Sequence, residues 1–132
     1  MRRVDWRAVG AGAAVALGVL VATMVAVQVV DGSIGLARDS NLVFVFYVVA
    51  LGGLAGGGWL AASRRPDAGL AHGLLAALSA YAVVAVFGAV LRLTVDKGPD
   101  PVALAFNGFM AAFAGVLGTL VADRWPRRSS VR

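Results

Sequence analysis

The chain has 132 residues, of which 60% are hydrophobic and only 14% are charged, and it contains no cysteine. A typical soluble domain has about 25% charged residues, and a small one needs polar residues to cover its large surface, so this composition argues against a soluble globular domain. The lack of cysteine excludes disulfides, thiolate metal ligands and thiol nucleophiles.

The few charges are segregated along the chain. The windows 8–30, 40–63, 68–91 and 102–122 contain no Asp, Glu, Lys or Arg, and each is 21 to 24 residues long. About 20 apolar residues in a helix cross the hydrocarbon core of a bilayer. The sequence therefore predicts an all-α polytopic membrane protein with four transmembrane helices in an up-down bundle, forming one domain.

The first two helices are expected at about 7–30 and 41–63. The chain starts with two arginines, as a signal peptide does, but the apolar run that follows is too long for one and is interpreted as a retained helix. Asp31 and Gly32 are expected to end this helix. The segment "DSN" at 39–41 offers capping oxygens for the second helix.

The third and fourth helices are expected at about 67–93 and 101–123. They are separated by "DKGPDP", in which Asp100 is placed to cap the fourth helix and Pro101 suits its first position. Residues 124–132 form a basic tail, interpreted as a cytoplasmic anchor at the lipid headgroups.

The arginines predict the orientation. Nine lie at the amino terminus, in the 64–67 turn and in the carboxyl tail, whereas the other side holds only Arg38, Arg92 and Lys97. The positive-inside rule then places both termini in the cytoplasm, and Trp6, Trp59 and Trp125 all fall near the same membrane surface. With eleven arginines and one lysine, the composition resembles that of a high-GC bacterium, so we expect a multi-pass protein of the bacterial cytoplasmic membrane.

The stretch "ALGGLAGGGWLAASRR" at 50–65 is the most distinctive segment. Gly56, Gly58 and Ala61 fit a loose G-x-G-x-x-A, but a dinucleotide site also needs an acidic residue about 20 positions later, and none is present there. A phosphate-binding loop would need a Gly-Lys pair, and no lysine is near. Both nucleotide-binding interpretations fail.

Close helix packing is the interpretation we favour, because small residues let transmembrane helices approach each other. An unwound segment at a transport site is the alternative. If the second and third helices form an antiparallel hairpin, Gly56 lies opposite Gly73, Gly53 opposite Ala76, and Gly52 opposite Ala77. The predicted packing residues are Gly52, Gly53, Gly56, Gly57, Gly69, Gly73, Ala76 and Ala77. Further small-residue stripes are Ala14, Gly18, Ala22 and Ala26 in the first helix, and Ala111, Gly115 and Gly118 in the fourth.

Two polar residues inside the spans are candidates for a functional role. His72 is the one ionisable residue within a span, and its expected role is to fill space near Gly57 and hydrogen-bond a carbonyl. Asn107 is expected to bond across the bundle to Gln28, Thr23 or Ser79. No set of residues typical of catalysis, metal binding or cofactor binding is present, and the arginines form no nucleic-acid-binding face.

Residues 51–78, "LGGLAGGGWLAASRRPDAGLAHGLLAAL", resemble a group of small, uncharacterised bacterial four-span membrane proteins. The shared features are a Gly-rich second helix, an Ala-x-Arg exit, a short turn and His-Gly at the start of the next helix. The resemblance implies no activity and no site residues. The expected function is a non-enzymatic accessory or structural subunit that contacts the bilayer, and itself or another membrane protein; the alternative is a small transporter or channel formed by a homo-oligomer.

Overall fold

The computed structural model describes residues 4–35, 40–64, 69–94 and 98–124, and these form four α-helices. They are α1 (Trp6–Ile34), α2 (Asn41–Arg64), α3 (Gly69–Leu93) and α4 (Pro101–Arg124). All four are long and apolar enough to cross a membrane. The predicted all-α class and the four helical segments are confirmed; residues 125–132 of the predicted tail lie outside the described residues.

The helix ends follow local capping chemistry, with one correction. The carboxylate of Asp5 accepts hydrogen bonds from the backbone N–H groups of Arg7 and Ala8, and that of Asp100 caps α4 as predicted, with bonds of 3.0 and 3.1 Å. The prediction that Asp31 and Gly32 end α1 was wrong. The helix continues to Ile34 and ends at Gly35, whose φ of 68° is a conformation that glycine adopts without steric cost.

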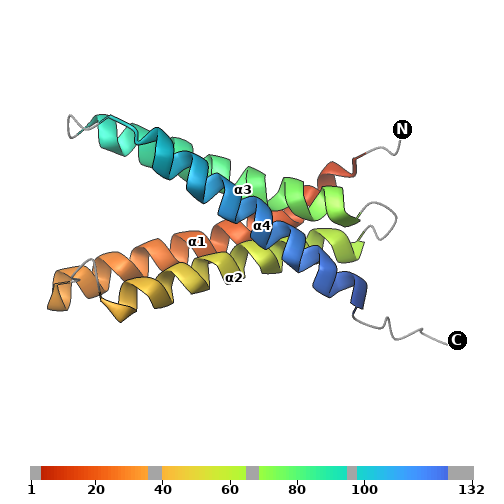
Figure 1. Ribbon diagram of the computed structural model, residues 1–132, viewed down its shortest axis with the longest axis horizontal. Coiled ribbons are helices and arrows are strands. Elements are labelled where there is room, and N and C mark those ends of the chain that lie inside the picture. The colour runs from red at the N-terminus through yellow and green to blue at the C-terminus, as the bar shows by residue number, and fades with distance from the viewer. Residues whose placement is uncertain (1–3, 36–39, 65–68, 95–97, 125–132) are drawn as a thin grey trace, which may run out of the picture.

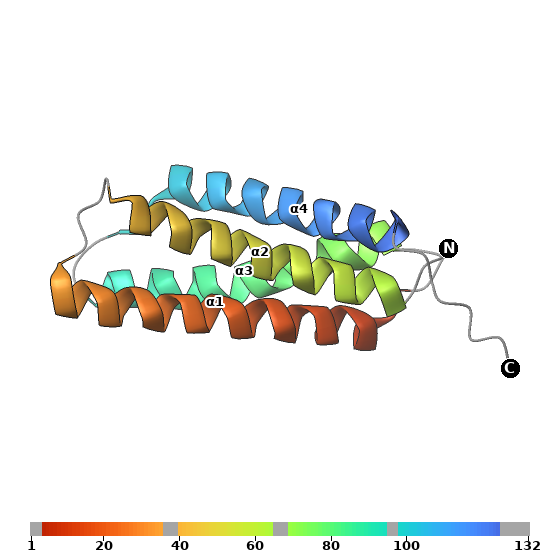
Figure 2. The ribbon, with the colours of Figure 1, turned by 90° about the horizontal axis from the view of Figure 1, so that it is seen from below.

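The helices form two hairpins that cross each other (Figure 1). The α1–α2 hairpin and the α3–α4 hairpin are packed together at the end where α1 begins and α4 ends, here called the N/C end, and they diverge toward the opposite, far end. Figure 2 shows α1 and α4 on opposite sides with α2 between them. Accordingly α2 packs against all three other helices.

Burial is concentrated in the half of the molecule at the N/C end, and in α1 it extends as far as Thr23. The buried residues of α2 lie between Gly53 and Ala62, those of α3 between Gly69 and Ala80, and those of α4 between Ala111 and Thr119. In the far half, none of the described residues in 24–35, 41–52, 81–94 and 98–110 is buried. The bundle is therefore closed at one end and open at the other.

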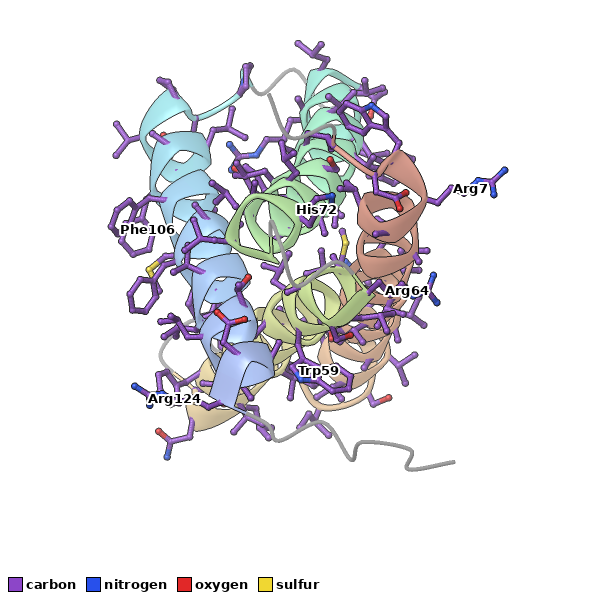
Figure 3. The ribbon with its side chains drawn as sticks, turned by 90° about the vertical axis from the view of Figure 1, so that its right-hand side faces the viewer. Arg7, Trp59, Arg64, His72, Phe106 and Arg124 are labelled. Carbon is purple, nitrogen blue, oxygen red and sulfur yellow. The ribbon has the colours of Figure 1, made fainter. Side chains whose placement is uncertain are left out.

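Arginines gather at the N/C end, and aromatic side chains lie on the outside of the bundle. Viewed from the N/C end, Arg7, Arg64 and Arg124 project outward around the bundle, while His72 points between α1 and α3 (Figure 3). Phe44, Phe106 and Phe109 are exposed on the outside of the bundle. Such a distribution, with apolar side chains outside and three of the four described arginines at one end, is typical of helices surrounded by lipid.

Candidate functional site

Backbone contact between α1 and α2 closes the N/C half. A Cβ atom added to Gly57 would overlap the carbonyl oxygen of Gly12 and lie 2.8 Å from the Cβ of Ala16. A Cβ on Gly12 would in turn overlap the carbonyl oxygen of Gly57. The two glycines are thus in reciprocal contact, and neither position has space for a side chain.

A second crossing joins α2 to α4. A Cβ on Gly58 would lie 2.7 Å from the carbonyl oxygen of Gly115, and a Cβ on Gly118 would overlap the carbonyl oxygen of Ala55. Backbone carbonyls cannot move aside as a side chain can. Gly115 and Gly118, predicted from the sequence to permit close approach of the fourth helix, do so.

The predicted pairing within the α2–α3 hairpin needs correction. A Cβ on Gly73 would lie 3.0 Å from the carbonyl oxygen of Gly58, two residues further along α2 than the expected Gly56. Two residues turn a helix by about 200°. The Gly52 and Gly56 positions therefore face away from α3. A Cβ at either would have no atom of another helix within 4 Å among the described residues.

The other predicted packing residues are buried but meet different helices. Gly53 lies against Val19 of α1, and a Cβ on Gly12 of α1 would lie 3.0 Å from the Cβ of Ala76. The Cβ of Ala77 faces Gly115 of α4, at 2.7 Å from a Cβ built there. Gly69 contacts Ala62 of α2 and Thr119 of α4. The small residues of α2 and α3 thus lie against α1 and α4 as well as against each other.

The predicted α1 stripe does not pack against the other helices of this chain. Ala14, Gly18 and Ala22 are exposed, and α1 instead packs through Val9, Gly12 and Ala16. The sequence "GAGAAVALG" at 10–18 offers small residues on more than one face, so spacing alone could not choose between them.

His72 is 1% exposed and connects α3 to the start of α1. Its Nε2 atom accepts a hydrogen bond of 2.9 Å from the backbone N–H of Asp5, the residue that caps α1. The ring thus meets the backbone of α1 through an amide that donates to Nε2. An accepting Nε2 means that the neutral ring carries its proton on Nδ1 in this arrangement. His72 therefore supports a helix start, a role that is compatible with a purely structural histidine.

Asn107 lines a groove of about 260 Å³ between α3 and α4 toward the far end. Within the described part of the chain, no hydrogen bond joins it to Gln28, Thr23 or Ser79; Thr23 instead bonds to the carbonyl of Val19 in its own helix. The groove, here called the far-end groove, also includes Arg92 and Asp100. His72 and Asn107 are therefore in different halves of the molecule and do not form one site.

A second cavity, here called the cleft, lies where the hairpins diverge and has a volume of about 340 Å³. Its walls come from α1 and α2 together with Val84 of α3, and they include Gln28 and Tyr47. The hydroxyl of Tyr47 is buried and has no hydrogen-bond partner among the described residues. The sequence contains no signal for the cleft, because it arises from the crossing of the two hairpins.

The two tyrosines give a matched pair of variants. The Tyr81 hydroxyl donates a hydrogen bond of 2.6 Å to the carbonyl oxygen of Leu104 and so joins α3 to α4. We expect Tyr81→Phe to lower the free energy of unfolding in detergent by about 0.6 kcal/mol, a typical value for such bonds between transmembrane helices. Tyr47→Phe should be neutral or stabilising, because it removes a buried hydroxyl that lacks a partner. Equal destabilisation in the two variants would contradict the assigned bond.

The described residues contain no group of three or more His, Cys, Asp or Glu side chains that could hold a metal ion. The features that the structure presents are the closed N/C half with its glycine contacts, the cleft and the far-end groove.

Comparison with protein families, with curated proteins and with solved structures found no match to this chain.

Proposed function

We propose that the chain is a polytopic integral membrane protein of the bacterial cytoplasmic membrane, with both termini in the cytoplasm, and that it acts as a non-enzymatic accessory or structural subunit. The four apolar helices and the arginines Arg7, Arg64 and Arg124 at one end support the membrane location and the orientation. The N/C half serves as a rigid anchor, and the far half provides the contact surface for another transmembrane segment.

The observation that carries this proposal is the contrast between the two halves. Glycine contacts hold the N/C half closed. Toward the far end none of the described residues in 24–35, 41–52, 81–94 and 98–110 is buried, and the cleft opens there, with Thr23 as its one buried lining residue. A protein whose only task was to span the bilayer would gain by packing its helices along their whole length. The open half is therefore interpreted as a surface that a partner helix completes.

The chemistry of the cleft favours a protein partner over lipid chains. Gln28 and Tyr47 bring an amide and a hydroxyl to its wall, next to apolar residues such as Ala50 and Val84. In hydrocarbon, such groups need hydrogen-bond partners, which lipid tails cannot supply. A helix with its own polar side chain at this depth would supply one.

A small transporter is the second candidate, favoured by the shape of the molecule. A cleft open at one end and closed at the other by glycine contacts resembles one state of an alternating-access protein. Such a protein would need water to enter the cleft, whereas a subunit with a partner helix in the cleft would exclude it.

Accessibility to a charged thiol reagent separates the two candidates. The chain has no cysteine, so single-cysteine variants have no background. For a membrane subunit, we expect Ala50→Cys in the cleft to resist modification in native membranes, while Thr94→Cys, beyond α3 at the far end, reacts. Reaction of Ala50→Cys at the rate of Thr94→Cys would contradict the subunit and support the transporter.

Photocross-linking then tests the surface itself. A photoreactive residue at Val84, in the cleft, should form adducts with a membrane protein, whereas the same residue at the exposed Val86 should form them mainly with lipid. Identical adducts from both positions would show that the cleft is not a specific contact surface.

A further inference from the structure

The geometry points to a binding site for the headgroup of a glycerophospholipid that carries a primary ammonium, located in the far-end groove. This site is separate from the cleft, with which it shares only Val84 among the lining residues. Between its polar groups the groove is lined by small and apolar residues, among them Ala85, Gly88, Ala89 and Ala103.

Opposite charges lie at the far end of the groove. Arg92 is in the last turn of α3, and Asp100 is the residue before α4; both are exposed, and no ion pair joins them in the structure. A guanidinium binds phosphate oxygens through two parallel hydrogen bonds. Asp100 uses its Oδ1 atom to cap α4, which leaves Oδ2 to accept a hydrogen bond from an ammonium group. Together they complement a zwitterion rather than a simple anion.

The polar groups are ordered along the groove as they are along a phospholipid. Asn107 follows Asp100 by seven residues, which is about 10 Å along a helix axis. Its amide N–H groups have no acceptor within the described chain, and at this depth they would meet the glycerol ester carbonyls of a bound lipid. The remaining wall, including Val84 and Ala85, is apolar and suits the start of an acyl chain.

The size of the groove fits a headgroup and not a whole lipid. A volume of about 260 Å³ equals that of eight or nine water molecules at ~30 Å³ each, and a phosphoethanolamine group has a similar number of heavy atoms. The acyl chains would remain in the bilayer. A phosphoglycerol headgroup would leave Asp100 facing an uncharged hydroxyl, and a choline ammonium has no hydrogen to donate to it.

Native mass spectrometry of the purified full-length protein tests the site. Phosphatidylethanolamine, phosphatidylcholine and phosphatidylglycerol are offered at equal concentration, and we expect adducts with phosphatidylethanolamine to dominate. Arg92→Gln should weaken the binding of this lipid about tenfold, the equivalent of about 1.4 kcal/mol. Arg124→Gln, the same change at the N/C end, should leave it unaltered.

Asp100→Asn is the second variant, because asparagine still caps the helix while the negative charge is lost. We expect it to abolish the preference for phosphatidylethanolamine over phosphatidylcholine, whereas Arg92→Gln weakens both lipids. The proposal is overturned if the wild-type protein binds the three lipids equally or prefers phosphatidylglycerol. It is equally overturned if Arg92→Gln and Arg124→Gln have the same effect.

Discussion

Gly57→Ala is expected to destabilise the protein by about 1–3 kcal/mol relative to Gly56→Ala, although the two glycines are neighbours in the same helix. The Cβ added at position 57 would overlap the carbonyl oxygen of Gly12 and crowd Ala16, so α1 and α2 would have to separate. The measurement is the free energy of unfolding in detergent micelles, followed by far-ultraviolet circular dichroism as a denaturing detergent is added.

Gly56→Ala is the matched control, because it makes the same chemical change one residue away. Gly56 lines a shallow cavity of about 470 Å³ between α2 and α4, and a Cβ there has no neighbour within 4 Å among the described residues. Both variants gain the same helix propensity, about 0.8–1.0 kcal/mol in peptides, so the difference between them isolates the packing term. If the two variants unfolded at the same detergent concentration, Gly57 would not be at the crossing of α1 and α2.

The contrast between Gly56 and Gly57 shows what the sequence could and could not predict. Four apolar windows bounded by charges determine the number of helices, and their ends follow from capping residues such as Asp100. These are local properties, and they were predicted except for the end of α1, which lies at Ile34 rather than at Asp31 and Gly32. Which face of each helix is inside is not a local property, because apolar and small residues occur on every face of a helix in lipid.

The error in the α2–α3 pairing has the same cause. Gly52, Gly53, Gly56, Gly57 and Gly58 offer small residues in nearly every direction around α2. The predicted hairpin register differed from the observed one by two residues, which is enough to move Gly56 to the surface and bring Gly58 against Gly73 and Gly115. In a soluble protein, polar residues on the outer face would have fixed the choice.

The polar residues of the far half were harder to place for a different reason. The sequence predicts that Asn107 is inside a bundle, and it would have a partner there if the helices stayed together to the far end. The hairpins diverge instead, so Asn107 and Tyr47 lie at two separate cavities, one on each hairpin. A crossing angle between hairpins depends on the glycine contacts at the N/C end, which no short sequence motif encodes.

His72→Leu is expected to destabilise the protein by about 1–3 kcal/mol, because it leaves the backbone N–H of Asp5 without the Nε2 acceptor. The same change should expose the start of α1, so that its first amides exchange with solvent faster than in the wild-type protein. His72→Gln provides the comparison, since its side-chain oxygen can accept a hydrogen bond. We expect this variant to recover part of the lost stability.

The ring of His72 also gives a direct measurement, because it is the only histidine in the chain. In the arrangement observed, Nε2 accepts a hydrogen bond, so nitrogen NMR of the labelled protein should show a neutral ring with its proton on Nδ1. A ring protonated on Nε2 cannot accept the bond from Asp5. That result would contradict the contact between His72 and the start of α1. So would a His72→Leu variant that is as stable as the wild type and shows unchanged amide exchange at the start of α1.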